Sequence, residues 1–204
     1  MPAELKAHVW FPTLIWQADI PDDEKYFIKG IKDFVLKEKK EVSTSHKIAD
    51  GRYNSVFKGG WRSKNYTNWA QLGSFGHMGQ KLDETIESCR IKIGVPELKL
   101  SAYWFSVNSY GDHTALHNHR DSVLSGVFYI DIPDKNMGNI NFERSDDISY
   151  FLPPLENYNN FTGERASYVP KTGRVLIFPS WLKHSVDTNR SKKNRISVSF
   201  NYGV

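Results

Sequence analysis

The chain has 204 residues and a mass of 23.5 kDa, which is enough for one domain with a core of its own. Hydrophobic residues make up 39% and charged residues 25%, as in ordinary globular proteins, so the composition excludes wholesale disorder. The only cysteine, Cys89, excludes an internal disulfide and any metal site built from thiolates alone. A net charge of +4 and a pI near 9.0 are mildly basic and favour anionic ligands.

The first half of the chain combines one predicted strand with two helical regions. Residues 9–15 read as a strand. Pro21 and the two acids after it open a helix. The apolar residues of that helix recur at helical spacing and are Phe27, Ile31, Phe34 and Val35. A second helical region is expected between residues 69 and 93, with Leu82, Ile86 and Cys89 on one stripe.

The second half consists of short apolar runs separated by turn-rich segments, which is typical of β structure. The predicted strands are 98–108, 125–132, 139–142, 174–178 and 195–202. A long polar and aromatic stretch, 144–167, is a candidate lid or substrate-gripping loop. Helices in front of strands predict an α+β fold, mainly β, with a sandwich or distorted barrel and no clear second domain.

Histidines are concentrated at one point of the sequence. His113, His117 and His119 lie within seven residues, and Asp121 follows them. On an extended chain, positions 117, 119 and 121 point to the same side, so this segment can offer a metal more than one ligand. His184 comes just after another apolar run and could supply a ligand from a distant part of the chain.

The last predicted strand alternates strictly between apolar and polar residues. Its polar face starts with Arg195 and continues with Ser197, Ser199 and Asn201. The guanidinium of Arg195 is a planar fork suited to a carboxylate. Clustered metal ligands together with such an arginine suggest an Fe(II) facial triad, which leaves positions open for a chelating 2-oxoacid and oxygen. The far carboxylate of the oxoacid would pair with Arg195 and the hydroxyl of Ser197.

Several segments, in this order, resemble the Fe(II)/2-oxoglutarate-dependent oxygenase superfamily, and more narrowly a phage and bacterial branch related to prolyl hydroxylases. They are Asn108-x-x-Gly111, His117-x-His119-x-x-Ser122, 124–130, 176–182, His184 and 195–201. The resemblance covers residues 101–201 well and the front more loosely. It implies a double-stranded β-helix (jelly-roll) barrel in a single domain, 1–204. Residues 1–97 would give helical support and outer strands, and 98–204 the core with the metal site.

The resemblance allows two sets of iron ligands. The commoner His-x-Asp pattern of the superfamily implies His119, Asp121 and His184. The narrower branch shows His-x-His and implies His117, His119 and His184, which we slightly prefer. His119 and His184 belong to both sets.

The same resemblance implies the cofactors Fe(II) and 2-oxoglutarate and two further binding residues. Tyr129 stands where a strand tyrosine often hydrogen-bonds the 2-oxoglutarate carboxylate, and Asn108 would contact the cosubstrate or the substrate. The enzyme would use molecular oxygen to hydroxylate a C–H bond of a small molecule, peptide or protein, with release of succinate and CO2. Peptidyl proline or another amino acid is slightly favoured.

Two alternatives stay open at this point. One is a jelly-roll module that binds a metal or ligand without turnover. The other is a cupin-like metalloenzyme with three histidine ligands that does not use 2-oxoglutarate and has no need of Arg195. The sequence contains no secretory signal and no run approaching the roughly 18 apolar residues of a membrane span. We therefore expect a cytoplasmic protein, of the cell or of a phage-infected host, with neither a membrane nor a nucleic acid as its main partner.

Overall fold

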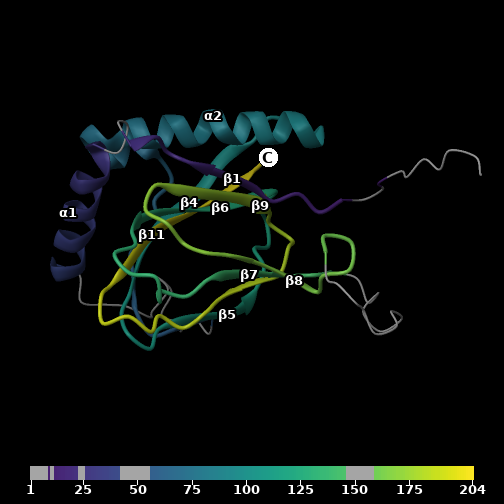
Figure 1. Cartoon of the computed structure of the whole chain (residues 1–204). Coiled ribbons are helices and arrows are strands. Elements are labelled where there is room, and N and C mark those ends of the chain that lie inside the picture. The colour runs from purple at the N-terminus through teal and green to yellow at the C-terminus, as the bar shows by residue number, and fades with distance from the viewer. Residues whose placement is uncertain (1–8, 10–11, 23–25, 42–55, 146–158) are drawn as a thin grey trace, which may run out of the picture.

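The computed structural model describes residues 9, 12–22, 26–41, 56–145 and 159–204. Two antiparallel β-sheets face each other, and two helices lie on the outer side of the larger sheet (Figure 1). The helices are α1 (Tyr26–Glu41) and α2 (Gly76–Ile93), and a 3-10 segment, η2 (Trp69–Phe75), leads into α2. This arrangement confirms the predicted class, mainly β with supporting helices near the N-terminus.

The larger sheet has six strands in the order β1-β9-β6-β11-β4-β3. Their bounds, in that order, are Trp16–Asp19, Arg174–Pro179, Leu124–Asp131, Arg195–Gly203, Lys99–Asn108 and Trp61–Arg62. The smaller sheet has five strands in the order β2-β5-β10-β7-β8. Their bounds are Phe57–Lys58, His113–His117, His184–Val186, Ile140–Glu143 and Arg165–Tyr168.

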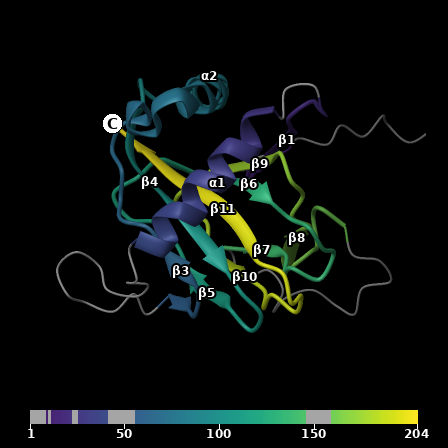
Figure 2. The same ribbon diagram turned by 90° about the vertical axis from the view of Figure 1, so that its left-hand side faces the viewer.

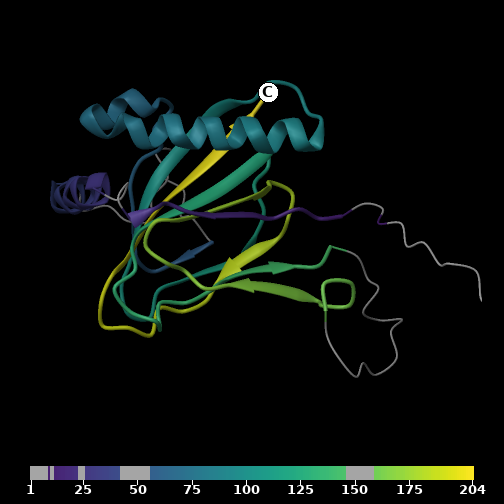
Figure 3. The same cartoon turned by 45° about the horizontal axis from the view of Figure 1, so that its top comes forward.

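A first core lies between the helices and the outer face of the larger sheet. Figure 2 looks onto α1 where it crosses this sheet, and Figure 3 shows α2 lying beside it. The helices bury their apolar stripes here, Phe27, Ile28, Ile31 and Val35 from α1 and Met78, Leu82, Ile86 and Cys89 from α2. The predicted helical spacings are therefore confirmed. Neither helix has the length and hydrophobicity that crossing a bilayer requires.

A second, smaller core lies between the two sheets. Its buried members are Val127, Tyr129, Ile140, Phe142, Leu176, Phe178 and Leu182. Strand β11 separates the two cores, because successive side chains of a strand point to opposite faces. Its apolar residues enter the first core, and Arg195, Ser197 and Ser199 face the space between the sheets. The predicted division of this strand into two faces is confirmed.

The structure differs from the sequence prediction mainly at short strands. The first strand starts at Trp16, where pairing with Ile177 of β9 begins. The described residues of the predicted 9–15 strand, 9 and 12–15, are not in a strand. Strands β2, β3, β5, β8 and β10 have two to five residues, too few for a periodic pattern. Strand β8 begins inside the predicted 144–167 loop, of which residues 146–158 are outside the described part.

Strand β6 packs closely against its neighbours at Gly126. A Cβ atom at this position would collide with the ring of Phe200 and lie 2.8 Å from the carbonyl oxygen of Leu176. Overpacking of this kind costs about 1–3 kcal/mol. We expect Gly126→Ala to lower the free energy of unfolding in urea by about that amount. Gly76→Ala is the control, because its Cβ would lie 3.6 Å from the nearest atom. Equal stability of the two variants would contradict the packing described here.

Candidate metal centre

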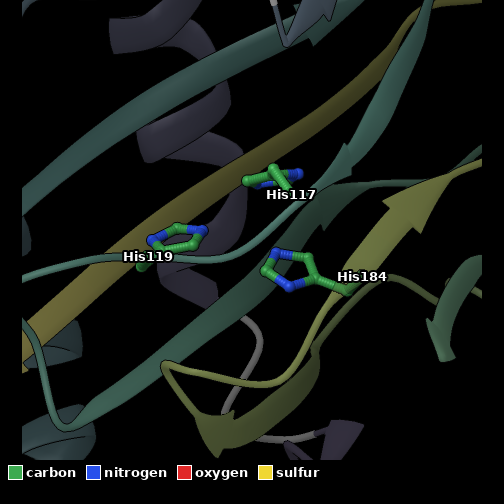
Figure 4. Close-up of side chains that lie close together, drawn as sticks. All are labelled: His117, His119 and His184. Atoms are coloured by element: carbon green, nitrogen blue, oxygen red, sulfur yellow. The ribbon is translucent and has the colours of Figure 1, made fainter. Parts of the chain in front are cut away.

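Three histidines converge between the sheets (Figure 4). His117 ends β5, and it lies directly opposite His184, the first residue of β10, in the antiparallel register. His119 follows two residues after His117. The ring centroids of His117 and His184 are 4.2 Å apart, and that of His119 lies 5.1 Å from each. One ring nitrogen from each histidine lies within 4.8 Å of the other two, close enough to share one metal ion.

Hydrogen bonds fix which nitrogen of each ring is available. The Nδ1–H of His117 donates to the carbonyl oxygen of Ala115 and that of His184 to Leu182, both at 2.9 Å. The Nδ1–H of His119 donates to Oδ1 of Asn201 at 2.7 Å. Each imidazole therefore has its Nε2 lone pair free, the arrangement that hydrogen-bonded metal-binding histidines show. The Nε2 of His119 is buried without any partner.

The electrostatics keep the three rings neutral. Burial lowers the pKa of all three histidines, to about 4 for His119 and about 3 for His184. The neighbouring imidazole of His117 lowers the pKa of both further. Neutral imidazoles are the form that binds a metal, and nitrogen ligands suit iron. The residues present therefore fit a bound Fe(II).

Asp121, the carboxylate of the alternative ligand set, lies away from this cluster. It is exposed in a turn, with a positive φ of 63°. Among the described residues, the group able to hold a metal consists of His117, His119 and His184 alone.

The histidines form one wall of a pocket between the sheets. All four residues predicted to bind a cosubstrate line it: Asn108, Tyr129, Arg195 and Ser197. Ser197 lies opposite Tyr129 on β6 and Ser106 on β4, and Arg195 lies opposite Asn108. Strand β11 thus brings the predicted residues to adjacent positions on three neighbouring strands.

Arg195 is buried, and carbonyl groups hold its guanidinium in place. Its Nη1 donates to the carbonyl oxygen of Met137 at 2.6 Å and to that of Gly138 at 3.3 Å. Gly138 has a φ of 81°, and a Cβ there would collide with the backbone of Asp187 and approach Nη1 of Arg195. Burial lowers the pKa of Arg195, and the charges of Asp112 and Asp187 offset this effect only in part. A bound anion would supply further compensation.

Sequence reasoning missed three polar or aromatic side chains that line the same pocket: Trp104, Ser106 and Thr114. Trp104, Ser106 and Asn108 alternate along β4 with buried Tyr103, Phe105 and Val107. This period of two was present in the sequence and could have identified the pocket face of the strand.

Residues 102–201 match the family described as "Putative 2OG-Fe(II) oxygenase", where 2OG is 2-oxoglutarate. The match covers 100 of the 204 residues, just under half of the chain, and this segment is similar to the 2OG-Fe(II) oxygenase family. The protein therefore carries an oxygenase domain whose cofactors are Fe(II) and 2-oxoglutarate and whose chemistry uses molecular oxygen and an organic substrate. A search of curated protein sequences finds no match.

Solved structures share the fold at low sequence identity. A prolyl-4-hydroxylase from Pseudomonas putida has a TM-score of 0.66 at 12% identity over 94% of this chain and 92% of that one. A prolyl hydroxylase from Trichoplax adhaerens, in complex with a peptide fragment of hypoxia inducible factor, has a TM-score of 0.65 at 12% identity, over 93% and 83%. HygX from Streptomyces hygroscopicus, with nickel and 2-oxoglutarate bound, scores 0.58 at 12% identity, over 94% and 82%. The expected 2OG-oxygenase fold is confirmed.

The buried histidines make the metal-free protein acid-sensitive. The pKa values of His119 and His184 lie below the ordinary value of 6.5. As the pH falls from about 6.5 towards 4, the unfolded chain therefore binds more protons than the folded protein, and the folded state loses stability. We expect His119 and His184 each to lower the free energy of unfolding by up to about 1.4 kcal/mol per pH unit in that window. Urea denaturation in a chelator at several pH values measures this slope.

The His119→Gln/His184→Gln double variant is the comparison. In this variant the free energy of unfolding should lose the pH dependence that comes from the two histidines and keep the pH dependence that comes from carboxylates. An identical slope in both proteins would show that the imidazoles are not held neutral by burial.

Proposed function

We propose that the protein is an Fe(II)- and 2-oxoglutarate-dependent hydroxylase with three histidine ligands, His117, His119 and His184. The observation that carries the proposal is the convergence of three Nδ1-anchored imidazoles on one point, in a pocket that also holds the buried Arg195. Bound iron would supply oxidation of a substrate C–H bond to C–OH by O2, coupled to conversion of 2-oxoglutarate to succinate and CO2.

The residues of the chain would orient the cosubstrate. Arg195 is positioned to bind the far carboxylate, since its fork is already held by Met137 and Gly138. Ser197 and Tyr129 face each other across β11 and β6 beside it. Burial raises the pKa of Tyr129 to about 12, so its hydroxyl keeps its proton and can donate a hydrogen bond to a carboxylate oxygen.

A site without a carboxylate ligand has a different charge from the His₂-carboxylate triad. Three neutral imidazoles leave the full 2+ charge of the ion, whereas a carboxylate would reduce it to 1+. The far carboxylate of 2-oxoglutarate would compensate Arg195, and its keto-acid carboxylate would then reduce the metal charge from 2+ to 1+. The apolar pocket walls, Val127, Ile140, Phe178 and Val186, keep bulk water away from this charge pair.

Two arms of one anaerobic titration test the ligand set and the cosubstrate. Fe(II) is added first and 2-oxoglutarate second, and the weak visible charge-transfer absorption of the chelate is recorded. We expect His117→Ala, His119→Ala and His184→Ala to abolish it and Asp121→Ala to retain it. Arg195→Met should weaken 2-oxoglutarate binding by about 10–100-fold, because a charged hydrogen bond contributes about 1.5–3 kcal/mol.

Arg165→Met is the matched control, since Arg165 is exposed and pairs with Glu143 on the smaller sheet. Circular dichroism checks that each variant is folded. Loss of the charge-transfer absorption in Asp121→Ala would assign Asp121, in place of His117, as the third iron ligand. Fe(II) binding without any band would favour the cupin-like enzyme that does not use 2-oxoglutarate.

We propose an amino acid as the substrate, with peptidyl proline first. The fold shared with two prolyl hydroxylases supports this choice. Incubation with Fe(II), 2-oxoglutarate and proline-containing peptides should release one succinate for each oxygen atom added to the peptide, as measured by mass spectrometry. The free L-amino acids form the second panel. Succinate release without an oxygenated product in either panel would rule out this substrate class.

A further inference from the structure

Two hydrogen-bond donors beside His119 have no partner among the described residues. Trp104 of β4 stacks against His119, with ring centroids 5.9 Å apart and planes 21° apart. The guanidinium carbon of Arg62 lies 4.5 Å from the centroid of the Trp104 ring. The indole Nε1 of Trp104 and the Nε of Arg62 are both buried without a hydrogen-bond acceptor. We call these two residues the Trp104–Arg62 corner.

Arg62 lies on the same face of the larger sheet as the pocket. In the β3–β4 register it is opposite Ser106, whose side chain lines the pocket, and paired residues of antiparallel strands share a face. Arg62 itself does not line the enclosed pocket. It is half-buried on an edge strand, over the ring of Trp104. The corner therefore lies at the edge of the larger sheet, where Trp104 lines the pocket.

The charge of Arg62 is not compensated. Its Nη1 donates to the carbonyl oxygen of Ser63 at 3.1 Å and its Nη2 to Oδ1 of Asn65 at 2.6 Å, both neutral acceptors. In the described part of the chain no carboxylate forms an ion pair with it. Burial lowers its pKa to about 10, which reflects the cost of holding this charge away from water. Neutral acceptors thus fix the guanidinium without neutralising it.

The pocket offers no acid that could take this role. Its lining contains no aspartate or glutamate, whereas Arg195 and Trp104 of the corner present donors to it. Asn108, opposite Arg195, is four residues from Trp104, or about 13 Å along the strand. A far carboxylate of 2-oxoglutarate held by Arg195 therefore leaves the donors of the corner free for a second anion.

We propose that the Trp104–Arg62 corner binds a carboxylate of the primary substrate and so selects substrates with a negative charge close to the reacting carbon. The inference rests on the proposed function, because it assumes that 2-oxoglutarate occupies the Arg195 end. An indole N–H and a guanidinium stacked on the same ring form a compact pair of donors for one carboxylate. A free amino acid with its α-carboxylate, or an acidic side chain next to the target residue, fits this chemistry.

The indole N–H resonance of Trp104 reports on the corner directly. The six tryptophans give six indole signals in a ¹H–¹⁵N spectrum, and Trp104→Phe assigns the relevant one while keeping the stacked ring. The protein is loaded with Zn(II) and saturating 2-oxoglutarate, and N-acetyl-L-proline is then added. We expect the Trp104 signal to shift with the carboxylate and not with the neutral N-acetyl-L-prolinamide. Exposed Trp181 is the internal control.

Arg62 variants complete the test. Arg62→Gln should weaken the response to the carboxylate by about tenfold or more, and Arg62→Lys should restore part of it, while the affinity for 2-oxoglutarate stays unchanged in both. Three results would overturn the proposal: a Trp104 shift that is complete with 2-oxoglutarate alone, equal responses to acid and amide, or a response independent of Arg62. Failure of 2-oxoglutarate to bind would be a separate result, against the proposed function itself.

Discussion

The alternation of side chains along β11 is the constraint on which the rest of the structure depends. This strand lies inside the larger sheet and pairs with both β4 and β6, so its register aligns three strands at once. One face supplies Val198 and Phe200 to the helix-covered core, and the other presents Arg195 to the pocket. A shift of one residue would exchange these faces, burying polar groups in the core and removing the arginine from the pocket. Stability and ligand binding are therefore specified by the same pairing.

The second layer around the metal centre is also built on this strand. Asn201, near its end, accepts the Nδ1–H of His119 and a hydrogen bond from Ser125 of β6, which in turn contacts Ser180 at 2.7 Å. The other two imidazoles are oriented by backbone carbonyls of their own segments. The ring orientations thus come from sheet geometry and not from the ion. Such a preorganised site needs little rearrangement when a metal binds.

The sequence was informative where a pattern is long or chemically unusual. The helical spacing of Phe27 and Ile31, the alternation of 195–202 and the histidine cluster predicted the helices, the two-faced strand and the residues that meet between the sheets. It could not decide between His117 and Asp121, since every second side chain of an extended chain points to the same side. The structure separates them because the strand ends at His117 and the chain turns at Asp121. Arg62 was invisible for a related reason, since only the pairing of the two-residue β3 with β4 brings it beside Trp104.

The position of the histidines also affects the stability of the smaller sheet. His117 and His184 face each other across β5 and β10, and β10 has only three residues, so few ladder hydrogen bonds hold this part of the smaller sheet. An ion bound by both would act as a cross-link between the two strands, as metals do in small domains with limited cores. The larger sheet needs no such link, because the helices cover it and its central strands have eight or more residues. Removal of the ion would then leave the smaller sheet easier to open, and to cleave with a protease, than the larger one.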